Sequence, residues 1–167
     1  MIIYLLGVVA GAKYDSTGGG VNFQCFPPNP DLNAYNANAR DVSWMRSVEY
    51  ESQNYGLFDY QLDNKHARCA RCYTRNRPAL LMIPAKTRCP EDWVTEYSGY
   101  LMAAKEDELH PTTYECVDSR PEYEGLSPAD LGGRLWFVNV DCTTGGSVGN
   151  CNQYRHGRQM TCVVCSK

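Results

Sequence analysis

The sequence has little of what would direct it to nucleic acid, to a membrane or to common catalytic chemistry. Its net charge is −3, so it offers no basic field for nucleic acid or anionic lipid. No apolar run reaches the length of a transmembrane helix. It has only three histidines, none beside a Ser or Cys nucleophile motif, and no phosphate-binding glycine loop. We therefore expect no nucleic-acid partner, no membrane insertion, no cofactor, no bound metal and no enzymatic activity.

Cysteine, by contrast, is abundant: the chain has nine in 167 residues, together with 12 tyrosines and 14 glycines. This composition is typical of proteins whose disulfides persist because their compartment is oxidising. The apolar residues 1–12 lack the basic segment of a signal peptide, and we interpret them as a strand. The cysteines therefore predict a secreted, extracellular protein.

The cysteines also form a repeat. Cys25 and Cys116 are 91 residues apart, while Cys69 and Cys72 each recur 93 residues later in the chain. The sequence CFPPNPD (residues 25–31) aligns with CVDSRPE (residues 116–122), so each copy has a proline five residues after its cysteine and then an acid. We predict one supersecondary unit used twice, in residues 1–78 and 79–167, packed as one compact domain.

The number of cysteines differs between the two copies. The counterpart of Cys89 in the first copy would precede Met1, so the sequence is short of one half-cystine there. We expect one of the first-copy thiols Cys25, Cys69 and Cys72 to be unpaired or bonded to another chain. Cys142 and Cys151 enclose a turn-rich loop and are expected to pair with each other. The remaining second-copy cysteines allow three connectivities, and they are Cys89, Cys116, Cys162 and Cys165.

A zinc site is the alternative interpretation of these cysteines. Both copies end in a Cys-x-x-Cys pair, a spacing that lets two thiolates reach one tetrahedral ion. The two pairs lie about 90 residues apart, and five further cysteines have no place in such a site. Structural disulfides are therefore the favoured interpretation.

Strand patterns dominate the secondary structure. Short β-branched or aromatic runs are bounded by Pro, Gly, Asp or Asn. Gly18–Gly20 and Gly132–Gly133 are expected to lie in turns, and residues 33–45 are the best helix candidate. The sequence predicts an all-β, disulfide-stapled fold of two pseudo-symmetric repeats with long loops, and the expected strands are residues 1–12, 79–84, 93–97, 112–117, 135–140 and 160–164.

Four segments carry a resemblance to a known family. They are ALLMIP (residues 79–84), EYSGYLM (96–102), YECVD (114–118) and MTCVVCSK (160–167). The chain resembles the cysteine-rich non-collagenous domain of short-chain sponge collagens and similar invertebrate secreted proteins over almost its whole length. That family usually has a Trp-Gly-Arg-x-x-Cys-Pro segment before the first repeat, which this sequence lacks. It also has no Gly-X-Y tract, so it cannot form a triple helix.

A free-standing domain of this type and size is similar to soluble lectins of marine sponges. The resemblance implies a multivalent lectin that binds N-acetylhexosamines (GlcNAc, GalNAc) and chitin oligomers. It also implies a homo-oligomer, with a tetramer as the form that the lectins suggest. The alternative is an extracellular-matrix module whose function is protein–protein association, like the ends of short-chain collagens.

Sugar binding requires an aromatic or apolar platform together with polar groups for the hydroxyls and the N-acetyl amide. An aromatic residue in a strand more often packs in the core, and an acid beside a proline more often caps a turn. A loop aromatic is a better ligand candidate because the core has less need of it. The candidate sugar-binding residues are Tyr114, Asp118, Arg120, Glu122, Tyr123, Trp136 and Trp44.

Overall fold

The computed structural model describes residues 2–32, 42–53, 55–125, 132–142 and 153–167, and their regular structure is entirely β. Ten strands form one open sheet whose main path runs β2-β1-β4-β3-β9-β6-β10-β5, with β7 added on β6 and β8 on β4. The all-β prediction is confirmed. The strands are β1 (Ile2–Gly11), β2 (Gln24–Phe26), β3 (Arg46–Tyr50), β4 (Lys65–Tyr73), β5 (Leu80–Pro84), β6 (Val94–Ala103), β7 (Glu115–Asp118), β8 (Tyr123–Glu124), β9 (Gly133–Phe137) and β10 (Thr161–Ser166).

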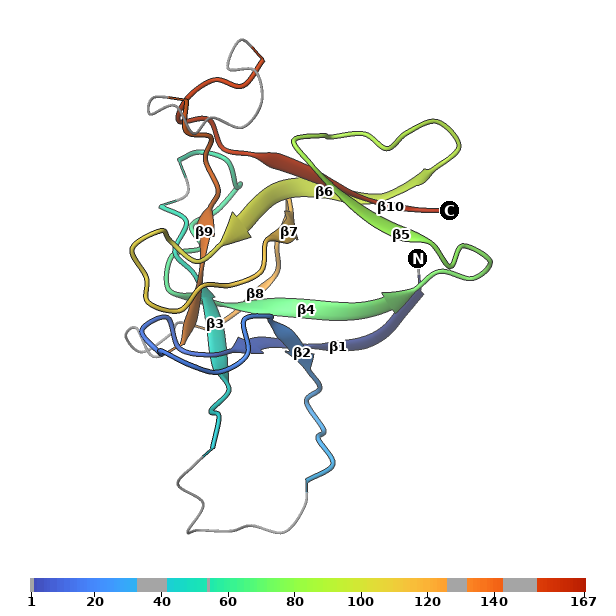
Figure 1. Ribbon diagram of the computed structural model, residues 1–167. Helices are drawn as coiled ribbons and strands as arrows, with labels where there is room; N and C mark the ends of the chain where they lie inside the picture. The colour runs from blue at the N-terminus through green and yellow to red at the C-terminus, as the bar shows by residue number, and fades with distance from the viewer. Residues whose placement is uncertain (1, 33–41, 54, 126–131, 143–152) are drawn as a thin grey trace.

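The sheet is bent into two arms that join at β3 and β9 (Figure 1). The first arm contains β1, β2 and β4, and the second contains β5, β6, β7 and β10. The arms diverge from the joint toward the side on which both termini lie (Figure 1). At the joint β3 and β9 pair in parallel, with Val48 opposite Gly133 and Tyr50 opposite Leu135.

The main core cluster lies at this joint. Val48, Leu62 and Met102 are completely buried, and Tyr50, Phe58, Ala67 and Leu135 pack with them. Because residues of both halves contribute, burial of this apolar surface holds the two arms together.

A buried ionic group lies beside the same joint. The Arg134 Nη1 and Glu108 Oε1 atoms are 3.4 Å apart, and Arg134 Nε is 3.8 Å from Glu49 Oε1. The guanidinium stacks on the Tyr14 ring, and Trp136 Nε1 donates a hydrogen bond to Glu108 Oε1. Buried carboxylates need such a cation, because an unpaired charge in the interior is costly. The group therefore fixes how β3, β9 and the adjoining loops fit together.

Strand pairing is alike in the two arms. Gly7 is opposite Cys69 in the β1–β4 ladder, and Gly99 is opposite Cys162 in the β6–β10 ladder. Likewise Val9 pairs with Cys25, and Leu101 pairs with Cys116. These registers are what a duplicated unit would give; that the two halves superpose stays a prediction.

Several local expectations need correction. Gly133 does not lie in a turn but begins β9, where a Cβ atom would come within 2.9 Å of the Ala12 carbonyl oxygen. Residues 42–45 are not helical, and 33–41 of the proposed helix lie outside the described residues. The strand expected at residues 93–97 continues as β6 to Ala103. The strands β2, β3, β4 and β8 were not predicted.

Glycine is required at one position in each long central strand. A Cβ atom on Gly7 would lie 2.0 Å from the Phe26 carbonyl oxygen, and one on Gly99 would lie 1.8 Å from that of Val117. Real Cβ atoms do not approach backbone atoms so closely. The two glycines therefore let β2 and β7 come close enough to pair with β1 and β6.

We predict that Gly7→Ala and Gly99→Ala each destabilise the fold by about 1–3 kcal/mol or more, because the added methyl group forces backbone apart. Gly18→Ala is the matched control, since no atom lies within 4 Å of its added Cβ. Denaturant unfolding of the three variants measures the difference. Equal stability of all three would contradict the close approach of β2 to β1 and of β7 to β6.

Candidate ligand-binding cleft

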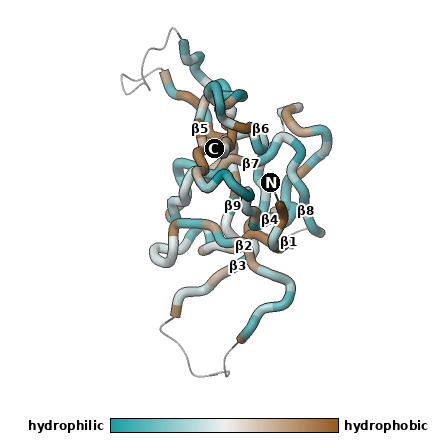
Figure 2. The backbone as a smooth tube through the Cα atoms, turned by 90° about the vertical axis from the view of Figure 1, so that its right-hand side faces the viewer, coloured by the Kyte–Doolittle hydropathy of each residue, from teal (hydrophilic) through white to brown (hydrophobic). Residues whose placement is uncertain are grey.

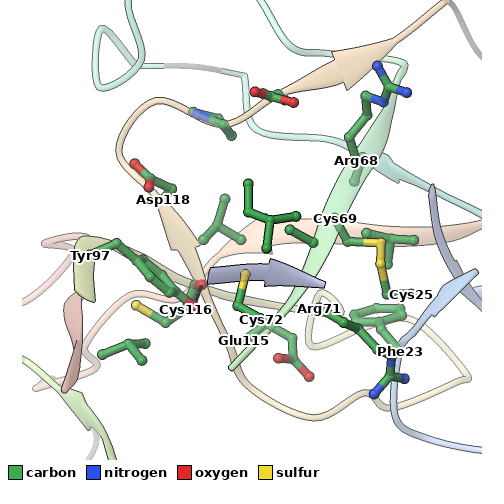
Figure 3. A pocket seen from close by; sticks show the side chains of 18 of the residues that line it. Phe23, Cys25, Arg68, Cys69, Arg71, Cys72, Tyr97, Glu115, Cys116 and Asp118 are labelled. Atoms are coloured by element: carbon green, nitrogen blue, oxygen red, sulfur yellow. Dashed lines mark hydrogen bonds between the residues drawn. A yellow bond between two sulfur atoms is a disulfide. The ribbon is translucent and has the colours of Figure 1, made fainter. Parts of the chain in front are cut away.

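A cleft with a volume of about 820 Å³ lies between the two arms. Its size falls within the range of about 300 to 1,000 Å³ typical of small-molecule sites. Figure 3 shows Cys25, Cys69 and Arg71 toward one side and Tyr97, Cys116 and Asp118 toward the other, with Cys72 between them. Both halves of the chain therefore contribute to it.

The interior of the cleft is mostly apolar. Side chains from β1, the loop before β2, and the strands of the second arm reach it, including Leu6, Phe23, Val117 and Val164. Leu135 at the joint closes its inner end. Such a surface can pack a methyl group or the C–H face of a sugar ring.

Arginine side chains supply hydrogen-bond donors around this surface. Arg71 Nη2 donates to Gln24 Oε1 at 2.7 Å, which leaves its other N–H groups available, and Arg68 Nε lies 3.7 Å from Glu124 Oε2. Arg77 is more firmly engaged, with its Nη2 3.1 Å from the buried Glu96 Oε1, to which Ser166 also donates. We thus expect Arg68 and Arg71, rather than Arg77, to meet a ligand.

The segment from Asp118 to Glu122 crosses between the arms. It leaves β7 on the second arm and reaches β8, which pairs with β4 on the first. The Tyr50 hydroxyl donates to the Glu122 carbonyl oxygen at 3.3 Å, and the Tyr60 hydroxyl donates to that of Pro121. Asp118, Arg120 and Glu122 are therefore held in place by backbone contacts although their side chains are exposed.

Two carboxylates of the cleft are already engaged locally. Asp118 Oδ1 accepts from the Arg120 backbone N–H at 2.9 Å, as in a capped turn. Thr113 Oγ1 donates to Glu115 Oε1 at 2.7 Å. Both keep further acceptor capacity on their second oxygens.

Tyr97 is a neutral polar group in the wall. Its hydroxyl donates to the Cys116 carbonyl oxygen at 3.0 Å. Burial, followed by the nearby charges of Glu115 and Asp118, raises the pKa of Tyr97 to about 12. Burial also raises the pKa of Tyr50 above its usual range. Both side chains act as hydrogen-bond donors at every physiological pH.

Disulfides brace both sides of the cleft. The bonds are Cys25–Cys69, Cys116–Cys162 and Cys89–Cys165, and the first two have the same Cα–Cα distance of 5.7 Å. Because these bonds use three of the four sulfurs of the Cys-x-x-Cys pairs, the zinc alternative is wrong. Cys142 is also disulfide-bonded, while its expected partner Cys151 lies outside the described residues.

Cys72 is the free thiol among the described cysteines, in line with the expected odd half-cystine of the first copy. It lines the cleft and is partly buried. Burial raises the pKa of the Cys72 thiol above its ordinary value. It is therefore mainly a neutral thiol at neutral pH.

The predicted sugar-binding residues do not all meet at one place. Asp118, Arg120 and Glu122 line the cleft. Tyr123 instead packs against Tyr60, with their ring centroids 5.4 Å apart, and Lys65 lies over its ring. Tyr114 is 62% exposed in the loop before β7 and does not line the cleft.

The two candidate tryptophans also lie elsewhere. Trp136 is partly buried on β9, where it donates to Glu108, so its contacts are those of a structural residue. Trp44 is exposed and borders a separate hollow with Lys13, Asp15 and Arg46. Sequence reasoning missed Arg68 and Arg71, although two arginines beside cysteines in KHARCARCY (residues 65–73) were a visible signal.

Two other kinds of feature are absent from the described part of the chain. No group of three His, Cys, Asp or Glu side chains there is placed to hold a metal ion. Nor do the described residues include a helix long and apolar enough to cross a membrane.

Comparison with known proteins gave no relative: no family model, no curated protein and no solved structure matches the chain.

The raised pKa of Tyr97 predicts a loss of stability in alkali. An unfolded tyrosine loses its proton near pH 10, whereas Tyr97 in the fold keeps its proton up to about pH 12. Its contribution is therefore complete below pH 10 and is lost as the pH rises through this window, by up to about 2 kcal/mol. Tyr97→Phe should flatten the decline of unfolding free energy between pH 9 and 11.5.

The matched control is Tyr114→Phe, because Tyr114 is exposed. All proteins should carry Cys72→Ser, so that no free thiol can exchange with the disulfides in alkali. An identical pH dependence for Tyr97→Phe and Tyr114→Phe would contradict the buried placement of Tyr97.

Proposed function

We propose that this protein is a non-catalytic carbohydrate-binding protein that holds N-acetylhexosamines, such as GlcNAc, GalNAc and chitin oligomers, in the cleft between its two arms. The observation that carries this proposal is the combination of an apolar interior with Arg120, Glu122 and Arg71 at one cleft. A non-polar ligand would not need the polar groups, and an inorganic ion would not need the apolar wall.

The chemistry of an N-acetylhexosamine matches this surface. Its acetyl methyl and ring C–H groups can pack against Leu6, Val117 and Val164, which removes apolar area from water. Its hydroxyl and amide groups need both donors and acceptors. Arginine N–H groups are the donors, while Glu122 and the second oxygen of Asp118 are the acceptors.

The engagement of the carboxylates supports binding rather than catalysis. Asp118 caps its own turn and Glu115 accepts from Thr113. A glycosidase uses two carboxyl groups that face each other across the scissile bond, one as an acid and the other as a base or nucleophile. Asp118 caps a turn and Glu115 accepts from a hydroxyl group, so both can accept a hydrogen bond from a sugar that is bound and released without reaction.

An extracellular location accords with the disulfides of the described residues, which are compatible with an oxidising compartment. A single carbohydrate site binds weakly, so a useful lectin gains avidity from several sites on one particle. We therefore include secretion and homo-oligomerisation, with a tetramer as the first expectation, in the proposal. The resemblance to sponge lectins, drawn from the sequence alone, leads to the same expectation.

Titration with the GlcNAc trimer chitotriose tests the proposal. The wild-type protein should bind it in isothermal titration calorimetry, and Arg120→Ala should weaken binding at least tenfold, about 1.4 kcal/mol, because hydrogen-bond donors that line the cleft are lost. Arg75→Ala is the matched control, since Arg75 is exposed and does not line the cleft. No binding at millimolar sugar, or equal binding by the two variants, would contradict the proposal.

The second candidate function is a matrix module for protein association. Large apolar side chains are exposed near the start of β1 and on β5, among them Ile3 at 58%, Tyr4 at 79% and Leu80 at 69%. Figure 2 shows these segments as hydrophobic near the two termini. Exposed apolar surface of this kind is common where proteins associate.

The same apolar strip generates a prediction about assembly. Sedimentation velocity should give a particle several times the mass of one chain, and Tyr4→Lys should shift it toward the monomer because a charge cannot be buried there cheaply. Tyr4 is chosen because, unlike Ile3 and Leu80, it does not line the cleft. Leu109→Lys is the control, since Leu109 is also exposed, at 67%, outside this strip. A wild-type monomer at every concentration would rule out the homo-oligomer, and assembly without sugar binding would favour the matrix module.

A further inference from the structure

A second hollow lies apart from the cleft, between the loop that follows β1 and the segment that leads into β3. Its volume is about 760 Å³, and none of its residues lines the cleft. Ala12, Lys13 and Asp15 form one side, with Trp44 and Arg46 on the other. It is large enough for a small ligand.

Trp44 is the most informative residue of this hollow. Trp44 is 66% exposed, whereas tryptophan in folded proteins is usually highly buried. A flat aromatic face beside a hollow is the surface on which a pyranose ring packs its C–H groups.

The charged residues around the hollow leave one positive charge in excess. Lys13 Nζ and Asp15 Oδ2 are 2.5 Å apart, and this hydrogen bond from Lys13, aided by the charge of Arg46, lowers the pKa of Asp15 below its usual value. Lys13 and Asp15 therefore neutralise each other. Arg46 adds a further positive charge, and its planar guanidinium can bind a carboxylate or sulfate with two hydrogen bonds.

The two loops of the hollow lie close together, and a buried histidine supports the loop that follows β1. A Cβ on Gly19 would contact Ala12 Cβ at 3.2 Å and Ser43 Oγ at 3.5 Å, so the two loops touch. His110 is only 3% exposed beneath them, and its ring nitrogens lie 3.2 Å from the Ser16 carbonyl oxygen and 3.1 Å from that of Gly20. This support keeps the glycine-rich loop in one position and lowers the ordering cost of binding.

We propose that this hollow is a second carbohydrate site, which binds a pyranose bearing an anionic group, with Trp44 under the ring and Arg46 on the anion. It extends the proposed function, because each chain would then hold two different sugars: a neutral N-acetylhexosamine in the cleft and an acidic sugar here. Alternating amino sugars and acidic sugars occur together in extracellular polysaccharides. The anion can be a uronic carboxylate or a sulfate ester, and both share the chemistry that Arg46 recognises.

Three tetrasaccharides distinguish these possibilities: hyaluronan, which carries carboxylates; chondroitin sulfate, which adds sulfate esters; and the neutral chitotetraose. In the Arg120→Ala variant, in which the cleft is weakened, calorimetry should show tighter binding of the two acidic sugars than of chitotetraose, and added salt should remove the difference. If hyaluronan and chondroitin sulfate bind with equal affinity, the carboxylate is the group that Arg46 recognises. If chondroitin sulfate binds more tightly, Arg46 recognises the sulfate ester.

Trp44→Ala should weaken binding of the acidic sugars at least tenfold and abolish the ligand-induced change in tryptophan fluorescence, while Trp93 and Trp136 remain as internal reporters of folding. Arg46→Gln should abolish the preference for acidic over neutral sugar. Arg75→Ala and Arg120→Ala are the matched controls, the latter because it alters only the cleft.

The results separate the two proposals. If Arg120→Ala loses chitotriose binding but binds the acidic tetrasaccharides as the wild-type protein does, the two sites are independent. Unchanged binding of the acidic tetrasaccharides in both Trp44→Ala and Arg46→Gln overturns the second site and leaves the cleft proposal standing. If the acidic tetrasaccharides bind Arg120→Ala, in which the cleft is weakened, no more tightly than chitotetraose does at low salt, the second site is also overturned.

Discussion

The parallel pairing of β3 with β9 is the contact on which the rest of this structure depends. One strand comes from each half of the chain, and Val48, Tyr50 and Leu135 bury the main core along their ladder. Gly132 allows the approach, because a Cβ there would lie 1.8 Å from the Ser47 carbonyl oxygen. Arg134 and Glu49 face each other in the same register and add a buried ion pair. In the main path of the sheet, the other strands lie on one side or the other of this pair.

The cleft follows from that arrangement. The arms are joined at one end and diverge at the other, so their inner faces are only partly covered by each other (Figure 1). A cleft with apolar walls would tend to close, since burial of those walls is favourable. Disulfides within the arms and the segment from Asp118 to Tyr123 across them oppose closure. The same features that stabilise the fold therefore leave a pre-formed cleft, in which a ligand would bind at little ordering cost.

The sequence was informative where short apolar runs and covalent chemistry decide the structure. The apolar run at residues 79–84 predicted β5, and the unequal cysteine count predicted one odd cysteine in the first copy, which the structure shows to be Cys72. The sequence did not predict β3, because this short strand contains the charged residue Glu49. Its burial is explained only by the ion pair with Arg134, which is distant in the sequence. The candidate residues Asp118, Arg120 and Glu122 reach the cleft together because they share one segment. Arg68 and Arg71 join them only through pairing of distant strands, which one sequence does not encode locally. Gly133 was assigned to a turn since its close backbone contact is likewise tertiary.

Two surfaces of different character thus lie on one fold: a largely apolar cleft that arginines also line, and an open hollow beside an exposed tryptophan. The central claim is that the cleft is occupied by an amino sugar. A crystal structure of the protein soaked with chitotriose tests it most directly. The account predicts an N-acetylhexosamine between the arms, its acetyl methyl against Val117 and Val164 and its polar groups on Arg120 and Glu122. A cleft filled instead by a segment of a neighbouring chain, or left without sugar at saturating concentration, would contradict it.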